Sequence, residues 1–176
     1  MRFILLIILA SCSPYFLFAQ IGTEPSVDNF KKAMEATNPS SEQVDSILNL
    51  SNRYIFVNID TCLILAKKGM ELTERSYPEK TIHARSMLIS GDAYRVNNEL
   101  VVAEKLYKKG RALHLSLANE GKAALADNKL GALNKERGDY EKAIQYYVRA
   151  LGVWDRIKDT INIYKPYINL SEVFFL

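Results

Sequence analysis

Histidine and cysteine are the side chains of this sequence best suited to metal or nucleophilic chemistry, and there are two of each. His83 and His114 are isolated, because neither has a second histidine or a cysteine at the short spacing of zinc ligands. We interpret both as solvent-exposed or boundary histidines. The glycines that could build a phosphate-binding loop are dispersed and do not cluster before a helix: Gly91, Gly110, Gly131 and Gly138. We therefore expect no metal and no cofactor.

The two cysteines differ in their surroundings. Cys12 lies in an apolar N-terminal segment, so Cys62 is the only cysteine left once that segment is removed. No internal disulfide can then form, even in an oxidising compartment. The apolar helical pattern around Cys62 favours a buried structural thiol over a reactive nucleophile.

Catalysis would require a convergent set of acid, base and nucleophile, as in a hydrolase or transferase built on a helical frame. No such set is visible, and we expect the chain not to be an enzyme. Four tyrosines, at positions 94, 107, 146 and 147, could form a stacking platform, but their helical spacing assigns most of them to the core. The 23 Lys+Arg and 20 Asp+Glu residues are interspersed, which argues against nucleic acid as a partner.

The first 19 residues have the composition of a secretory signal peptide. Arg2 precedes an apolar stretch, and Ala19 is a small residue at a plausible cleavage point. We expect export to the periplasm or cell envelope, with cleavage after Ala19. Two alternatives stay open: the segment ending at Cys12 resembles the lipobox of bacterial lipoproteins, which implies a lipid anchor, and the apolar stretch could remain as a membrane anchor.

From Ser26 onward, apolar residues recur at spacings of three and four, which predicts an all-α protein. Residues 20–40 form an N-terminal segment with a leading helix over 26–37, and residues 41–176 form the repeats. Three helix pairs and a final unpaired helix are expected in the repeats: 41–55 with 60–75, 78–96 with 99–117, 121–136 with 140–157, and one from Asp159 onward.

The helices repeat with a period of 40 residues. A small residue recurs at positions 51, 91, 131 and 171, and further small residues stand two turns apart at 62/69, 103/110 and 143/150. Small residues on a helix face let two helices approach closely, and large residues fill the remaining space. We expect Tyr54, Tyr94, Tyr107, Tyr147 and Phe174 to do so. A single pair cannot bury its apolar face alone, so neighbouring pairs must stack.

The order of small and aromatic residues resembles the tetratricopeptide repeat, most closely at Leu130-Gly131, Gly138-Asp139-Tyr140, Ala143, Tyr147 and Ala150. The resemblance implies a right-handed superhelical array of antiparallel helix pairs, an α-solenoid. Two features depart from the standard repeat, which is shorter and ends its second helix with proline. Asp127 and Asn134 also replace bulky residues. The longer period resembles the sensor regions of bacterial envelope histidine kinases and transcriptional regulators.

In tetratricopeptide arrays the first helix of each pair lines a concave surface that binds proteins or peptides. Carried over, the resemblance implies a polar, somewhat basic lining, suited to an extended or helical peptide with acid groups. The implied residues are Asn49, Asn52, Arg85, Asp92, Arg95, Asn128, Lys129, Lys135, Lys165, Asn169 and Glu172. The alternative is that these are ordinary solvated helix faces.

Two functions follow from these patterns. The first is an exported protein-interaction scaffold, and the second is the extracytoplasmic sensor part of a longer histidine kinase or transcriptional regulator. The sequence ends with Val173-Phe174-Phe175-Leu176, which is apolar where repeat arrays usually carry a polar capping helix. We expect either a truncated piece of a longer repeat protein or self-association through the last helix.

Overall fold

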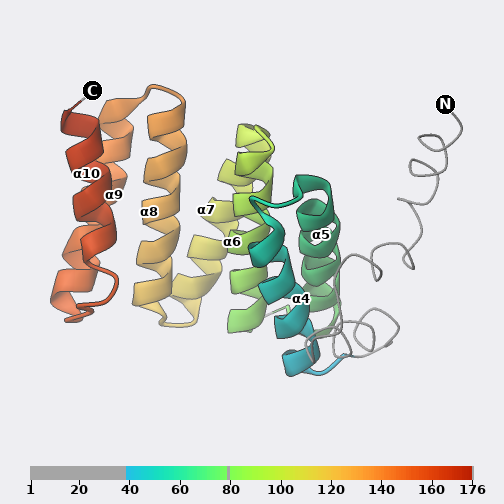
Figure 1. Cartoon of the computed structure of the whole chain (residues 1–176). Coiled ribbons are helices and arrows are strands. Elements are labelled where there is room, and N and C mark those ends of the chain that lie inside the picture. The colour runs from blue at the N-terminus through green and yellow to red at the C-terminus, as the bar shows by residue number, and fades with distance from the viewer. Residues whose placement is uncertain (1–38, 79, 176) are drawn as a thin grey trace, which may run out of the picture.

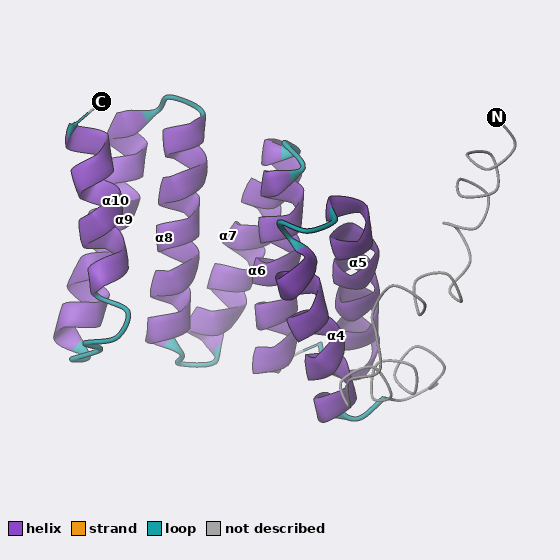
Figure 2. Cartoon of the chain, in the orientation of Figure 1, coloured by secondary structure: helices purple, strands orange, loops and turns teal. Residues whose placement is uncertain are grey.

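The computed structural model describes residues 39–78 and 80–175, and these residues form helices joined by short loops (Figure 2). The predicted signal peptide, Cys12 and the leading helix lie outside the described residues. No helix in the described part of the chain combines the length and apolar character needed to cross a membrane.

Seven helices follow one another in the described residues: α4 Ser41–Tyr54, α5 Ile59–Ser76, α6 Thr81–Val96, α7 Leu100–Ser116, α8 Glu120–Glu136, α9 Tyr140–Arg156 and α10 Tyr164–Phe174. The all-α prediction is confirmed. Most predicted boundaries are within one residue of the observed ones, with two corrections. The second pair begins at Thr81, not at Pro78, and α10 begins at Tyr164, because the Asp159 side chain accepts hydrogen bonds from the Ile161 and Asn162 amides and holds a turn there.

The helices stand side by side as an array of antiparallel pairs (Figure 1). The pairs are α4 with α5, α6 with α7, and α8 with α9, and α10 packs mainly against α9. Each first helix also contacts the first helix of the next pair: α4 with α6, α6 with α8, and α8 with α10. Within the described chain, the second helices α5, α7 and α9 contact one another less than the first helices do. The first helices therefore form the inner side of the array.

Four turns in the second half of the chain share one geometry. Asn98, Ala118, Gly138 and Lys158 have positive φ values of 61°, 54°, 77° and 57° and recur every 20 residues. In each turn the amide after this residue donates to a carbonyl five residues earlier, as in the Schellman motif. The spacing arises because α7, α8 and α9 are each 17 residues long.

Glycine notches on the first helices receive tyrosine rings, as predicted. A Cβ atom on Gly91 would lie 2.5 Å from Cε1 of Tyr107, and one on Gly131 would lie 2.5 Å from Cε1 of Tyr147. Both tyrosines are fully buried. The prediction was wrong for Phe174, which is 71% exposed, because Val173 is the residue that α10 buries at this end.

The two residues that replace bulky positions of the tetratricopeptide pattern, Asp127 and Asn134, are buried polar residues of α8. Asp127 is buried in α8, and its carboxylate accepts from Arg111 of α7 at 2.8 Å and pairs with Arg149 of α9 at 3.4 Å. Asn134 donates to the Leu130 carbonyl at 2.7 Å. A charged residue can replace a bulky one here because both arginines reach it.

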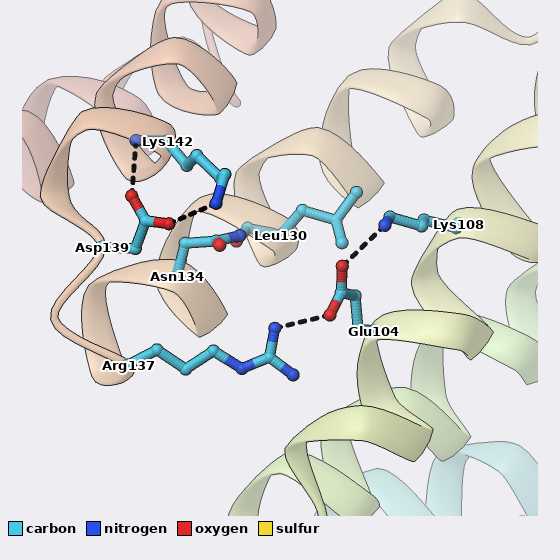
Figure 3. Close-up of polar contacts among 7 residues, drawn as sticks. All are labelled: Glu104, Lys108, Leu130, Asn134, Arg137, Asp139 and Lys142. Atoms are coloured by element: carbon cyan, nitrogen blue, oxygen red, sulfur yellow. Dashed lines mark hydrogen bonds and ion pairs between the residues drawn. The ribbon is translucent and has the colours of Figure 1, made fainter.

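An exposed ion-pair network covers the turn between α8 and α9 (Figure 3). Glu104 of α7 accepts from Lys108 at 2.6 Å and from Arg137 at 2.5 Å. Hydrogen bonds from these two cations lower the pKa of Glu104. At the same turn, the Asp139 side chain caps α9 by accepting from the Lys142 amide. The network ties the second pair to the third.

Candidate binding groove

All eleven residues proposed for the concave surface lie on the four first helices. Asn49 and Asn52 belong to α4, and the remaining nine are divided equally among α6, α8 and α10. The contacts among α4, α6, α8 and α10 place these helices along one side of the array. We call this side of the array the groove.

Polar contacts cross this groove from each first helix to the next. Arg85 donates to Asp45 and, at 2.5 Å, to Asn49, and Lys129 donates to Asp92 at 2.5 Å. Three further bridges link α6 to α8 and α8 to α10: Arg95 to Glu136, Lys135 to Glu172, and Asn169 to Asn128. The partners are 36 to 41 residues apart, about one repeat. Nine of the eleven predicted residues take part.

The other two predicted residues have different surroundings. Asn52 is exposed and lines a cavity described below, and Lys165 donates to the side chain of Asn162 at 2.7 Å. Burial, followed by repulsion from Lys129 and Lys122, lowers the pKa of Lys165.

The expected basic lining needs a correction. Each of Arg85, Arg95, Lys129 and Lys135 pairs with a carboxylate on a neighbouring first helix. The prediction missed two of these acids, Asp45 and Glu136. Asp45 has the register position of the predicted Arg85, one repeat earlier, whereas Glu136 lies one residue beyond the inner positions of the family. Opposite charges one repeat apart were the signal that could have found them.

A cavity of about 210 Å³ opens in the groove between α6 and α8. Four predicted residues line it: Asn52, Arg85, Asp92 and Lys129. Six more were missed by sequence reasoning: Thr81, Leu88, Ile89, His114, Lys122 and Leu125. We call this space the His114 cavity.

Asp92 joins the cavity wall to the core. One carboxylate oxygen accepts from the Tyr107 hydroxyl at 2.7 Å, and the other accepts from Lys129 at 2.5 Å. Burial, together with the nearby charge of Asp92, raises the pKa of Tyr107. Both oxygens of this buried carboxylate are therefore engaged within the protein.

Both histidines are buried, which corrects their interpretation as exposed or boundary residues. His83 packs between α5 and α6, where its Nδ1 lies 2.9 Å from the Thr73 hydroxyl. His114 is 1% exposed, and neither ring nitrogen has a hydrogen-bond partner among the described protein atoms. Burial and the positive charge of Lys122 lower the pKa of His114 to about 4. The register could have indicated this, since His114 lies one repeat before Trp154, another large ring.

The remaining candidates for chemistry are Cys62 and the side chains that could bind a metal ion. Cys62 is fully buried, and burial raises the pKa of its thiol, in agreement with a structural role. Within residues 39–78 and 80–175, no group of three or more His, Cys, Asp or Glu side chains is arranged to hold a metal ion.

The fold belongs to the class of all-α helical-repeat solenoids. It is similar to the crystal structure of BtubC (BKLC) from P. vanneervenii, with a TM-score of 0.70 and 17% identity over 96% of this chain and 77% of that chain. It is also similar to the crystal structure of MamA, with a TM-score of 0.51 and 16% identity over 88% of this chain and 95% of that chain. No protein-family model and no curated protein sequence matches the chain. At these identities the similarity establishes the fold alone.

Proposed function

We propose that this protein is an interaction scaffold that holds a peptide segment of a partner protein in the groove of the first helices. The observation that carries the proposal is the His114 cavity, which opens in the middle of the groove and contains an imidazole without a hydrogen-bond partner in the described chain. A concave site with a few convergent polar groups is the usual form of a binding site.

The paired charges of the groove favour a particular kind of recognition. The cations at positions 85, 95, 129 and 135 are bound to carboxylates of the same chain, so an acidic peptide would have to displace those carboxylates. Asn52 is exposed on α4 and presents an amide group that suits a peptide backbone. The proposed partner is therefore a mostly uncharged peptide segment in an extended or helical form.

Site-specific photo-crosslinking in the native host tests the scaffold. A photoreactive phenylalanine analogue would be placed in the groove at Asn52, and matched controls would carry it at Lys105 of α7 and Gln145 of α9, which are exposed on second helices. We expect one discrete adduct from position 52 and none of that mass from the controls. The same adduct from all three positions, or adducts from the controls only, would contradict the groove as the binding surface.

We also propose that the protein is exported, on the basis of the signal-peptide composition of residues 1–19. Mass spectrometry of the N-terminus of protein purified from the host tests this. A chain beginning at Gln20 supports simple cleavage, and a lipidated Cys12 supports the lipoprotein alternative. An intact Met1 in cytoplasmic protein would contradict export.

A further inference from the structure

The repeat that follows the His114 cavity indicates what kind of group this space accepts. Trp154 stands on α9 where His114 stands on α7, one repeat earlier. Its indole is buried, and Nε1 donates to the Gly121 carbonyl at 3.2 Å. Gly121 corresponds to Thr81, which lines the His114 cavity. The cavity beside Trp154 is about 160 Å³, smaller than the 210 Å³ beside His114. The cavity is therefore larger in the repeat that has the smaller ring, the imidazole of His114.

The His114 cavity has apolar and polar lining residues. Leu88, Ile89 and Leu125 supply hydrocarbon surface, and His114 is a buried lining residue whose two ring nitrogens are not hydrogen-bonded within the described chain. The Asp92 carboxylate is already engaged on both oxygens. The imidazole is thus the polar group of the cavity most in need of a partner.

The volume limits the size of the guest. Pockets for drug-sized molecules range from about 300 to 1,000 Å³, so a cavity of about 210 Å³ is suited to one side chain. Because burial keeps His114 neutral near pH 7, its ring offers one donor and one acceptor. A phenol hydroxyl can donate and accept, and it matches either nitrogen.

We propose that the His114 cavity receives a tyrosine side chain of the bound peptide, with the ring against Leu88, Ile89 and Leu125 and the hydroxyl on the His114 imidazole. This inference rests on the proposed scaffold function and specifies the anchor of its peptide. Lys122 at the rim adds a cation of the kind that interacts favourably with an aromatic face.

Other side chains fit the cavity less well. A phenylalanine would leave the buried imidazole without a hydrogen bond, and buried polar groups that stay unpaired discriminate strongly against such a guest. A glutamate would have to lose the hydration of its carboxylate against the apolar walls, and a lysine or arginine would meet Arg85, Lys122 and Lys129. The phenol avoids all three costs.

The two histidines of the chain make a direct binding assay possible, because selective ¹⁵N labelling of histidine gives signals from His83 and His114 only. The probes are blocked pentapeptides, Gly-Gly-Tyr-Gly-Gly and its phenylalanine and glutamate counterparts. We expect the tyrosine peptide to shift the His114 ring signals while His83 stays unchanged, with the other two peptides binding at least about tenfold more weakly. No shift of His114 at millimolar peptide, or equal binding of the three peptides, would overturn the proposal.

Two substitutions separate the anchor from a structural role. His114→Trp places the indole of the next repeat in the cavity and should abolish binding of the tyrosine peptide, whereas Leu115→Trp, on the exposed face of the same helix turn, should leave it unchanged. His114→Leu puts an apolar side chain at this position and should bring the tyrosine-to-phenylalanine affinity ratio close to one. A ratio that stays at about ten in His114→Leu would overturn the hydroxyl contact.

The groove adduct distinguishes the two levels of the proposal. If the adduct from position 52 forms in the wild type and equally in His114→Trp, the tyrosine anchor is wrong while the scaffold function stands. If no groove adduct forms in the wild type, the scaffold function itself is wrong. Circular dichroism of each variant would confirm that its helices are intact.

Discussion

Acid should destabilise this protein in a measurable part through one buried ring, that of His114. Charged groups face it from both neighbouring first helices: Arg85 and Asp92 from α6, and Lys122 and Lys129 from α8. Arg85 and Asp92 each have an opposite charge as partner, and Lys129 is the partner of Asp92. Lys122 therefore adds to the cost of a positive imidazole, and burial supplies most of that cost.

The magnitude follows from the difference in pKa between the two states. The folded pKa of His114 is about 4, whereas an unfolded histidine has a pKa of about 6.5. Between these values the unfolded chain binds more protons, so stability falls as the pH falls from about 6.5 to about 4. At pH 4.5 the loss is about 2–3 kcal/mol relative to pH 7.5, and the effect of the ring fades to nearly zero about one pH unit above 6.5.

Urea unfolding followed by circular dichroism at pH 7.5 and pH 4.5 would measure this loss. The control is His114→Leu, which removes the titrating ring from the cavity. Other acid-sensitive groups, such as His83, whose pKa burial also lowers, act in both proteins and cancel in the comparison. We expect the wild type to lose about 2–3 kcal/mol more than the variant between the two pH values.

Equal losses in the two proteins would refute this reasoning. A titration midpoint near 6.5 for the His114 ring, read from its NMR signals in the folded protein, would also contradict it. Either result would mean that the ring reaches water or a counter-charge, and the description of His114 as a buried ring would then be wrong.

Three further predictions concern packing and turns, and urea unfolding at pH 7.5 measures each of them. Gly131→Ala should lower the free energy of unfolding by about 1–3 kcal/mol, because the new Cβ would meet the Tyr147 ring. Gly152→Ala, in open space on α9, should raise it by about 1 kcal/mol; equal effects would refute the notch. Tyr147→Phe should raise the free energy of unfolding by about 1 kcal/mol, because it removes a buried hydroxyl without a hydrogen-bond partner in the described chain. Tyr107→Phe should lower it by about 1–2 kcal/mol, because it removes the hydroxyl that donates to Asp92. The opposite order of the two variants would contradict these hydrogen-bond assignments. Ala118→Gly should stabilise by about 0.5–1 kcal/mol, because glycine adopts the positive φ of this turn without strain, and a loss of stability would refute that conformation.

The contrast between Tyr107 and Tyr147 shows how a repeat protein varies one site. Both rings fill glycine notches one repeat apart. The Tyr107 hydroxyl donates to Asp92, but the residue that corresponds to Asp92 in the next repeat is Ala132. The same packing is therefore kept while the polar partner is lost, and the His114 cavity forms in the repeat that kept the aspartate.

Sequence periodicity determined the helices and their close packing. Apolar spacing of three and four residues requires a helix with one buried face, and small residues 40 apart predicted the notches at Gly91 and Gly131. The apolar spacing is visible within one helix, and the small residues become visible when successive repeats are compared. The turn at Ala118 has no glycine, in contrast to the turn at Gly138, so the sequence does not indicate its positive φ.

Only the tertiary structure decided the chemistry of the groove. The pairing of Arg85 with Asp45, and of Arg95 with Glu136, depends on how far one helix pair is rotated against the next, which the pattern within a single repeat does not specify. The burial of His114 is a second case, because the size of its cavity is set jointly by side chains of α4, α6, α7 and α8. Hydrophobic periodicity indicates which face of each helix is buried against its neighbours. Charge pairing and cavity shape depend on side chains from several helices that meet at one place.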